Sequence, residues 1–440
     1  MPVQPRLVSY YPMFFVIGYL SFCLTAGILG PVEYRDYNKL VTAIFVGLTL
    51  VAFAIGFGLG TNAPLRISRK MGHAGIEHTV SKLFQVCLIL ASISTLIIFA
   101  QAALEGSLSL NISNSGAAYF AAYEGYERNT GSYGFTFLLS SFSAFPVFLT
   151  MIWGIYYLRS FSYRRKILIV SIILITIVVF TISGGKQKQF GDILVYSLTL
   201  YFIGAIVGQR FKVKAVLIYS MIASLGVVVL LALLTARYAT IGINLSNINA
   251  AIHPLMTFDE THVINRVFGD HIGFAMSVFS SYLGQGFYGL SLALDHEFTW
   301  TAFGGSSYSW SVILNRFLGF PFMVEQSYPY LVGDTTGWAS TKWHSLYAWL
   351  ASDFTFTGTV FLNVIIGYIF GQLWKEILFC ENPFSILFFC LLSVGAIYAP
   401  ANNQLMHTPG GLFTLILTVF FYYRYRGAYN FQKLKLDNRI

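Results

Sequence analysis

Residues 167–185 read ILIVSIILITIVVFTISGG and contain no charged side chain. About 20 apolar residues are enough for a helix to cross the hydrocarbon core of a bilayer, so this run predicts a transmembrane helix. The whole chain has the same character. Of its 440 residues, 56% are hydrophobic and only 10% are charged, whereas soluble domains carry about 25% charged residues. The sequence therefore predicts an all-α polytopic membrane protein.

Similar apolar runs recur along the chain. They predict ten transmembrane helices, at 10–30, 40–60, 83–104, 134–158, 167–183, 190–208, 215–235, 346–372, 384–402 and 410–423. A further run at 272–294 is apolar but interrupted by Gly273, Gly284, Gly286 and Gly289. It is compatible with a re-entrant, an interfacial or a spanning helix. The predicted total is therefore about 10–12 transmembrane helices.

The distribution of Lys and Arg sets the predicted orientation, because cytoplasmic segments carry an excess of these residues. With the N-terminus inside, 18 of the 27 cations but only 4 of the 18 acidic residues fall on the cytoplasmic side. The net charge of +9 then divides into +14 inside and −5 outside. Both termini are predicted to be cytoplasmic, and the basic balance reflects topology rather than nucleic-acid binding.

This topology divides the chain into three parts. Residues 1–235 hold the N-terminal transmembrane helices with a short extracytoplasmic loop at 105–133, and residues 346–440 hold the C-terminal helices and a basic cytoplasmic tail. Between them, residues 236–345 form a large extracytoplasmic segment, too polar for lipid yet rich in Trp, Tyr, Phe and Gly. Such a segment is expected to fold over a cavity and to carry the selective contacts.

The sequence contains no motif for a metal site, a disulfide or ATP-driven transport. The four cysteines lie in or beside apolar runs, so neither a metal site nor a disulfide is predicted. No Walker loop, GxGxxG motif or internal repeat is present, so an ATP-driven pump is not indicated.

Nine cations lie on the predicted outer side, against the charge bias, and five of them are candidates for binding an anion. Lys186 and Lys188 stand in the turn SGGKQKQ at 183–189, between two apolar helices. Adjacent glycines expose backbone amides, and the start of the next helix adds its positive dipole end, which suits a phosphate. The alternative is an ordinary hairpin with two lysines that reach to the membrane surface.

The other three outer cations are arginines with aromatic neighbours. Arg237 follows the apolar run 215–235, Arg266 begins the stretch RVFGDH, and Arg128 follows an aromatic string. Arginine can hold a pyrophosphate in fork geometry, and aromatic rings suit the apolar faces of sugars. The alternative is that each arginine pairs with a nearby acid such as Glu127, Asp259 or Asp270.

Two titratable residues mark the beginning of the apolar run 346–372. His344 lies at the predicted outer interface, where a solvent-accessible imidazole can take a proton from a sugar hydroxyl. A single interfacial histidine is also commonly structural. Asp353 lies deeper in the same predicted helix, too far along it to bond His344, and carboxylates at membrane depth are usually functional.

Three of these segments together resemble the O-antigen polymerase and ligase superfamily. Residues 344–358 are similar to its His-Asn/Ser-x-Tyr signature, with His344, Ser345, Tyr347, Asp353 and Gly358 at matching positions. Thr355 stands where that signature usually has Gly. Residues 183–188 resemble the Ser-Gly-Ser-Arg turn of these proteins, with lysine in place of arginine. The string YLGQGFYGLSLAL at 282–294, which includes Tyr288, looks like one found in repeat-unit polymerases.

The resemblance implies a GT-C-like glycosyltransferase in the bacterial inner membrane, with its active site facing the periplasm. Such a polymerase transfers a growing glycan from undecaprenyl diphosphate to the non-reducing end of a new lipid-linked repeat unit, without a metal or other cofactor. The implied partners are the lipid-linked oligosaccharide, membrane lipid and a chain-length regulator. Arg237 and Arg266, helped by Lys186 and Lys188, are expected to hold the diphosphate. His344 is expected to activate or orient the acceptor hydroxyl, and Arg128, Asp353 and Tyr288 to complete the substrate site.

Two alternatives to a polymerase stay open. A ligase of the same superfamily would transfer finished glycan to lipid A-core. A flippase or secondary transporter would also need outer cations, but it should place ionisable residues at mid-membrane and show two similar halves.

Overall fold

The computed structural model describes residues 6–65, 73–108, 116–119, 135–208, 213–240, 242–244, 246–340 and 342–426. Nearly all of its regular structure is helical, with one two-stranded sheet among the described residues. The main helices are α1 Tyr11–Leu29, α2 Lys39–Asn62, α3 His73–Leu104, α5 Phe135–Tyr156, α6 Tyr163–Thr176, α7 Lys188–Val207, α8 Val213–Thr240, α10 Val263–Ala293, α14 Leu346–Cys380, α15 Pro383–Tyr398 and α16 Pro409–Tyr425.

All ten segments predicted as transmembrane helices are helical. Among the described residues, eight helices are long and apolar enough to cross a membrane, which confirms an all-α, multi-pass membrane protein. The other two predicted spans form α15 and α16, with 16 and 17 residues, which are shorter than a typical crossing.

The chain forms two compact units that alternate along the sequence. Unit 1 comprises Met1–Pro64, Asn244–Lys375 and Val394–Leu412. Unit 2 comprises Leu65–Ile243, Glu376–Ser393 and Phe413–Ile440. Each unit therefore combines residues from the beginning and from the end of the chain.

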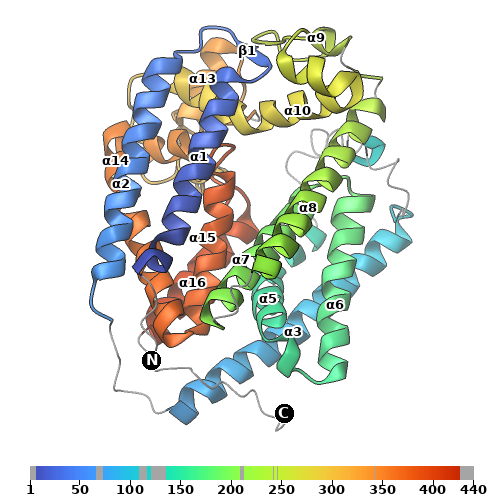
Figure 1. Ribbon diagram of the computed structural model, residues 1–440, viewed down its shortest axis with the longest axis vertical. Coiled ribbons are helices and arrows are strands. Elements are labelled where there is room, and N and C mark those ends of the chain that lie inside the picture. The colour runs from blue at the N-terminus through green and yellow to red at the C-terminus, as the bar shows by residue number, and fades with distance from the viewer. Residues whose placement is uncertain are drawn as a thin grey trace. The chain divides into compact units, whose positions relative to one another are not determined.

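In unit 1, the helix α10 lies across the ends of α1 and α2 (Figure 1). Gly27 of α1 and Gly284 of α10 form the contact, since a Cβ added to Gly27 would lie 2.9 Å from the Cα of Gly284. Two glycines let the helix backbones approach closely. Residues 272–294, whose placement the sequence left open, thus form a well-packed helix that is not among the eight candidate spans.

Short elements surround α10 in unit 1. Strand β1 (Val32–Tyr34) pairs antiparallel with β2 (Met256–Phe258), with Val32 opposite Phe258. The helices α9 Ile248–Ala251, α11 Tyr308–Leu318, α12 Phe322–Glu325 and α13 Tyr328–Thr336 complete the segment. Much of the predicted extracytoplasmic segment is therefore helical.

In unit 2, α5 packs against α3, α6 and α7, and α7 packs against α8. The π-helix η4 (Ile177–Ser183) continues α6 towards the turn before α7. Trp153 Nε1 of α5 donates to the carbonyl of Pro383 at 3.0 Å. A buried carboxylate, Glu376, accepts hydrogen bonds from Ser385 and Tyr422.

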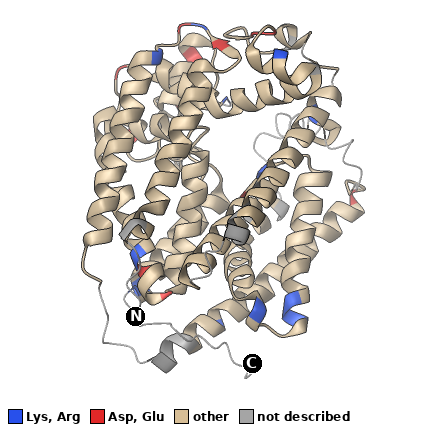
Figure 2. Ribbon diagram, in the orientation of Figure 1, with Lys and Arg blue, Asp and Glu red and all other residues tan. Residues whose placement is uncertain are grey.

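In unit 1, several helix ends that the predicted topology places on the same side of the membrane lie together. Charged residues lie mainly at helix ends and in connections (Figure 2). In unit 1, Lys375 Nζ donates to Ala63 O at 2.6 Å and Trp374 Nε1 donates to Val8 O at 3.2 Å, so three ends predicted to be cytoplasmic lie together. The pairing of β1 with β2 joins two segments that are both predicted to be extracytoplasmic. Which set faces the cytoplasm stays a prediction.

Candidate functional site

The turn after η4 in unit 2 requires a glycine, because one of its residues has a left-handed backbone conformation. Gly184 N donates to Val179 O at 3.0 Å and Lys186 N donates to Phe180 O at 2.9 Å, which closes the end of the π-helix. Between them, Gly185 has a φ of 63°, in the left-handed region that favours glycine. The Lys186 side chain is exposed, and Lys188, at the start of α7, forms an ion pair with Asp192.

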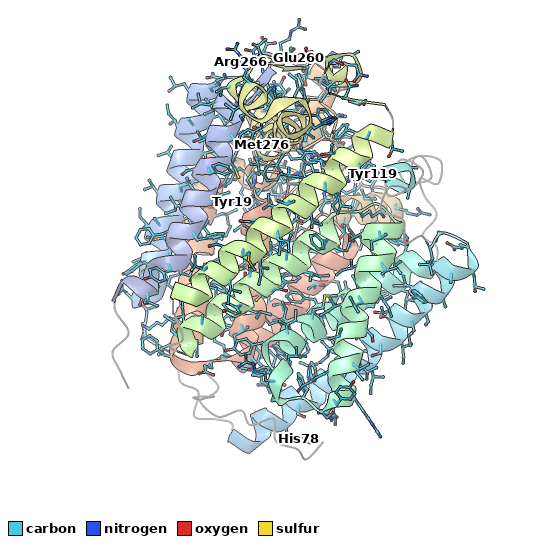
Figure 3. The ribbon with its side chains drawn as sticks, turned by 45° about the vertical axis from the view of Figure 1, so that its right-hand side comes forward. Tyr19, His78, Tyr119, Glu260, Arg266 and Met276 are labelled. Atoms are coloured by element: carbon cyan, nitrogen blue, oxygen red, sulfur yellow. The ribbon has the colours of Figure 1, made fainter. Side chains whose placement is uncertain are left out.

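Arg237 lies against this turn. Its side chain is only 8% exposed, and Nη2 donates to Gly185 O at 3.4 Å. The guanidinium carbon lies 3.7 Å from the ring centroid of Tyr119, a cation–π contact (Tyr119 is labelled in Figure 3). The structure thus brings together three predicted site residues, Arg237, Lys186 and Lys188, at the positive N-terminal end of α7. A cationic cluster of this kind can bind a phosphate.

The two other predicted arginines are not part of this cluster. Arg128 lies outside the described residues. Arg266 belongs to unit 1, in the first turn of α10, and its exposed side chain lies with Glu260 at one end of that unit (Figure 3). The hydroxyl and amide of Thr261 lower the pKa of Asp259, and the charge of Arg266 acts in the same direction.

His344 in unit 1 is fully buried, so the expectation of a solvent-accessible base is wrong. Burial lowers the pKa of His344 to about 4, although the carbonyls of Ala339 and Trp338 oppose the shift. The ring is therefore neutral at physiological pH. With Nε2 donating to Ala339 O at 3.2 Å, Nδ1 becomes an acceptor, and it has no hydrogen-bond partner among the described residues.

The segment that begins with His344 packs directly on α10. Ser345 N donates to Gly286 O at 3.0 Å. A Cβ added to Gly289 would lie 2.9 Å from His344 Nδ1, so only glycine leaves room for the imidazole. Two segments that the sequence singled out separately, 282–294 and 344–358, therefore meet in the interior of unit 1.

Tyr288 lies in an aromatic cluster beside this contact. Its ring stacks on Tyr34 with centroids 4.7 Å apart and meets Trp338 edge-on at 5.0 Å. The side chain is fully buried, and burial raises the pKa of the Tyr288 hydroxyl to about 12. The hydroxyl has no hydrogen-bond partner among the described residues. Tyr288 thus contributes one buried polar atom rather than an open ring face.

Asp353 is held by protein donors. Its Oδ2 accepts from the amide of Ser306 at 2.7 Å, and its Oδ1 accepts from the amide of Gly305 at 3.2 Å and from the hydroxyl of Thr301. The side chain is 5% exposed. Two residues later, Thr355 interrupts α14 with a φ of 62° and a ψ of 166°. Asp353 thus fixes a loop to a broken helix, as irregular backbone at membrane depth requires.

Two polar segments were missed by reasoning from sequence. One is the loop 301–307, which supplies the donors to Asp353. The other is the connection 399–408, from which Asn403 Nδ2 donates to Ser306 O at 2.6 Å, and His407 O accepts from Ser309 Oγ at 2.8 Å. The runs GGSS at 304–307 and NNQ at 402–404 were signals, because both are polar runs beside apolar segments.

The chain thus has two chemically distinct candidate regions. Unit 2 carries a cationic turn suited to an anion, and unit 1 carries a polar interior with a neutral imidazole. In comparisons with known proteins, no family model, no curated protein and no solved structure matches this chain.

Proposed function

We propose that this protein is a lipid-linked glycosyltransferase of the GT-C type. In this proposal it polymerises oligosaccharide repeat units carried on undecaprenyl diphosphate in a bacterial inner membrane. The observation that carries the proposal is the hydrogen bond from Ser345 N to Gly286 O at 3.0 Å. It joins the two segments in which the resemblance to repeat-unit polymerases is densest, although they lie far apart in sequence.

The cationic turn supports the same proposal. Arg237 provides permanent positive charge for a diphosphate leaving group, and Lys186 adds an exposed cation beside it. Lys188 is paired with Asp192 and lies at the start of α7. Stabilising charge that develops as a leaving group departs is often the largest contribution to catalysis. Because Arg237 is held by Gly185 O and the Tyr119 ring, its guanidinium is positioned before substrate binds.

His344 has a more limited role in this proposal than that of a strong base. Its neutral, fully buried imidazole lies against Gly289 and fixes the segment before α14 on α10, so His344 acts as a positioning residue within unit 1. The bond between the sugar C1 and the diphosphate oxygen breaks, and a bond from C1 to the acceptor oxygen forms. The hydroxyl proton leaves with the diphosphate. Asp353 acts as a positioning residue, because it holds the loop 301–307.

Complementation of a strain that lacks the protein tests the proposal. Arg237→Ala should abolish the glycan ladder and leave single-repeat product, and Arg237→Lys should restore part of it. Arg159→Ala is the matched control, because Arg159 is exposed on the predicted cytoplasmic side. A normal ladder from Arg237→Ala at normal protein levels would contradict the assignment of Arg237.

Purified protein distinguishes the proposal from its alternatives. Incubation with a lipid-linked repeat unit should give a ladder of longer lipid-linked products. Transfer to lipid A-core without elongation would indicate a ligase instead. Movement of the lipid across a vesicle membrane without any new glycosidic bond would indicate a flippase.

A further inference from the structure

Helix α11 buries two serines and exposes several large apolar residues, together with Asn315 and Arg316 near its C-terminal end. Its buried residues are Ser309 and Ser311, whereas Trp310, Phe317 and Leu318 are 43%, 73% and 58% exposed. A surface helix of a soluble domain buries its apolar stripe and exposes its polar residues. The reversed pattern is expected of a helix whose outer face contacts a medium as apolar as a hydrocarbon.

The buried serines of α11 have defined partners. Ser309 Oγ donates to His407 O at 2.8 Å, and Ser311 Oγ donates to Tyr308 O at 2.9 Å. Ser307, the N-cap residue, accepts from Trp310 N and donates to Met406 O. The hydroxyls therefore face the protein interior because they are satisfied there, which fixes the apolar residues on the outside.

The beginning of α11 is attached to a candidate membrane-spanning helix. Ser306, two residues before α11, donates its amide to Asp353, and Thr301 Oγ1 donates to Ser352 O at 2.8 Å. Asp353 lies seven residues into the candidate span Leu346–Cys380, which corresponds to about 10 Å along a helix. The loop before α11 therefore packs against the N-terminal part of that span.

The loop before α11 exposes aromatic rings beside this span. Trp300 and Phe303 are 52% and 59% exposed, and the Phe303 ring lies 5.8 Å from that of Phe354 in α14. Ala302 and Phe303 both have positive φ, 52° and 64°, in a turn closed by Gly304 N donating to Thr301 O. Such a conformation is costly for residues other than glycine, so the surrounding contacts must hold it.

We infer that α11 and the loop 298–303 are seated in the bilayer, in the leaflet where α14 begins, with their exposed aromatic face against lipid acyl chains. Trp and Phe with an exposed Arg316 in the last turn are typical of a membrane interface, where arginine extends its charge to the headgroups. This inference is independent of the proposed glycosyltransferase activity. It also places part of the segment predicted to be extracytoplasmic within the membrane.

Site-directed spin labelling of the full-length protein in lipid nanodiscs tests the inference. The label is attached at Phe317→Cys and, separately, at Trp310→Cys, and its collisions with oxygen and with a water-soluble nickel chelate are measured. Leu48→Cys, on the exposed face of the candidate span α2, is the lipid reference. Thr261→Cys, in an exposed turn, is the water reference.

The expected result is a ratio of oxygen to nickel collisions at 317 and 310 that resembles that at 48 and exceeds that at 261. A ratio like that at 261 would place the face in water and overturn the inference. Low collision rates with both reagents would show that protein, such as a second copy of the chain, covers the face, which also overturns it. If Phe317→Cys does not fold, the measurement at 310 decides between these outcomes.

Discussion

Gly269 and Thr355 adopt nearly the same backbone conformation, and each interrupts a helix in unit 1. Their φ and ψ angles are 70° and 176° for Gly269 and 62° and 166° for Thr355. This region is essentially restricted to glycine, because a Cβ meets the neighbouring backbone there. Thr355 compensates in part, since its Oγ1 accepts from Gly358 N at 3.1 Å and caps the second half of α14.

Thr355→Gly should therefore stabilise the protein by about 1–2 kcal/mol, because it removes the strain and costs only a few tenths of a kcal/mol as a cap. Thr355→Ala should destabilise it, since alanine keeps the strain and loses the cap. Thermal unfolding in detergent measures both changes. The matched control is Gly269→Ala, which should lower the melting temperature by introducing the same strain. A lower melting temperature for Thr355→Gly would contradict the role assigned to the strain.

Asp353→Ala should destabilise unit 1 by about 3 kcal/mol, because the buried amides of Gly305 and Ser306 would lose their acceptor. Asp353→Asn should have a smaller effect, since one oxygen is retained. The melting temperature of each purified variant is the measurement. Asp295→Ala is the control, because Asp295 is exposed, and its effect should stay within about 0.5 kcal/mol. Equal losses for the two alanine variants would refute the anchoring role.

Acidification should destabilise the protein through His344. Its pKa is about 4 in the folded state and 6.5 when exposed, so the unfolded chain binds more protons between these values. The free energy of unfolding therefore keeps its full value above about pH 6.5. It falls as the pH decreases towards 4, by up to about 3 kcal/mol. Melting temperatures between pH 7 and pH 4.5 should fall more steeply for the wild type than for His344→Gln. Parallel curves would show that His344 does not contribute.

Gly286→Ala should destabilise the packing of α10 against the connection 399–408. The added Cβ would lie 1.9 Å from Pro400 O. The nearest atoms all belong to the backbone of Pro400 and Ala401, so no flexible side chain can move aside. A loss of about 3 kcal/mol is expected from this overpacking. Gly18→Ala in α1 is the control, because nothing lies within 4 Å, and a gain of about 0.5–1 kcal/mol is expected. Melting temperatures of the two variants should thus change in opposite directions.

The helices were predictable because their signal is local. An apolar run of sufficient length is a property of consecutive residues, so the ten predicted segments were found as helices. The grouping of Arg237 with the turn at Lys186 was also predictable, because both follow apolar runs that end on the same predicted side. The burial of His344 was not, since the sequence shows only its place beside an apolar run and not α10 covering it.

The sequence by itself determined that this is a membrane protein. It also determined the positions of the main helices and the cations that are candidates for binding an anion. Only the tertiary structure decided that Asp353 anchors a loop, that His344 is buried against Gly289 and that α11 carries its apolar residues outwards. The reason is physical. Hydropathy and charge can be summed along the chain, whereas burial and hydrogen-bond partners depend on which distant segments fold against each other. Asp353 and its donors, for instance, are 47 to 52 residues apart.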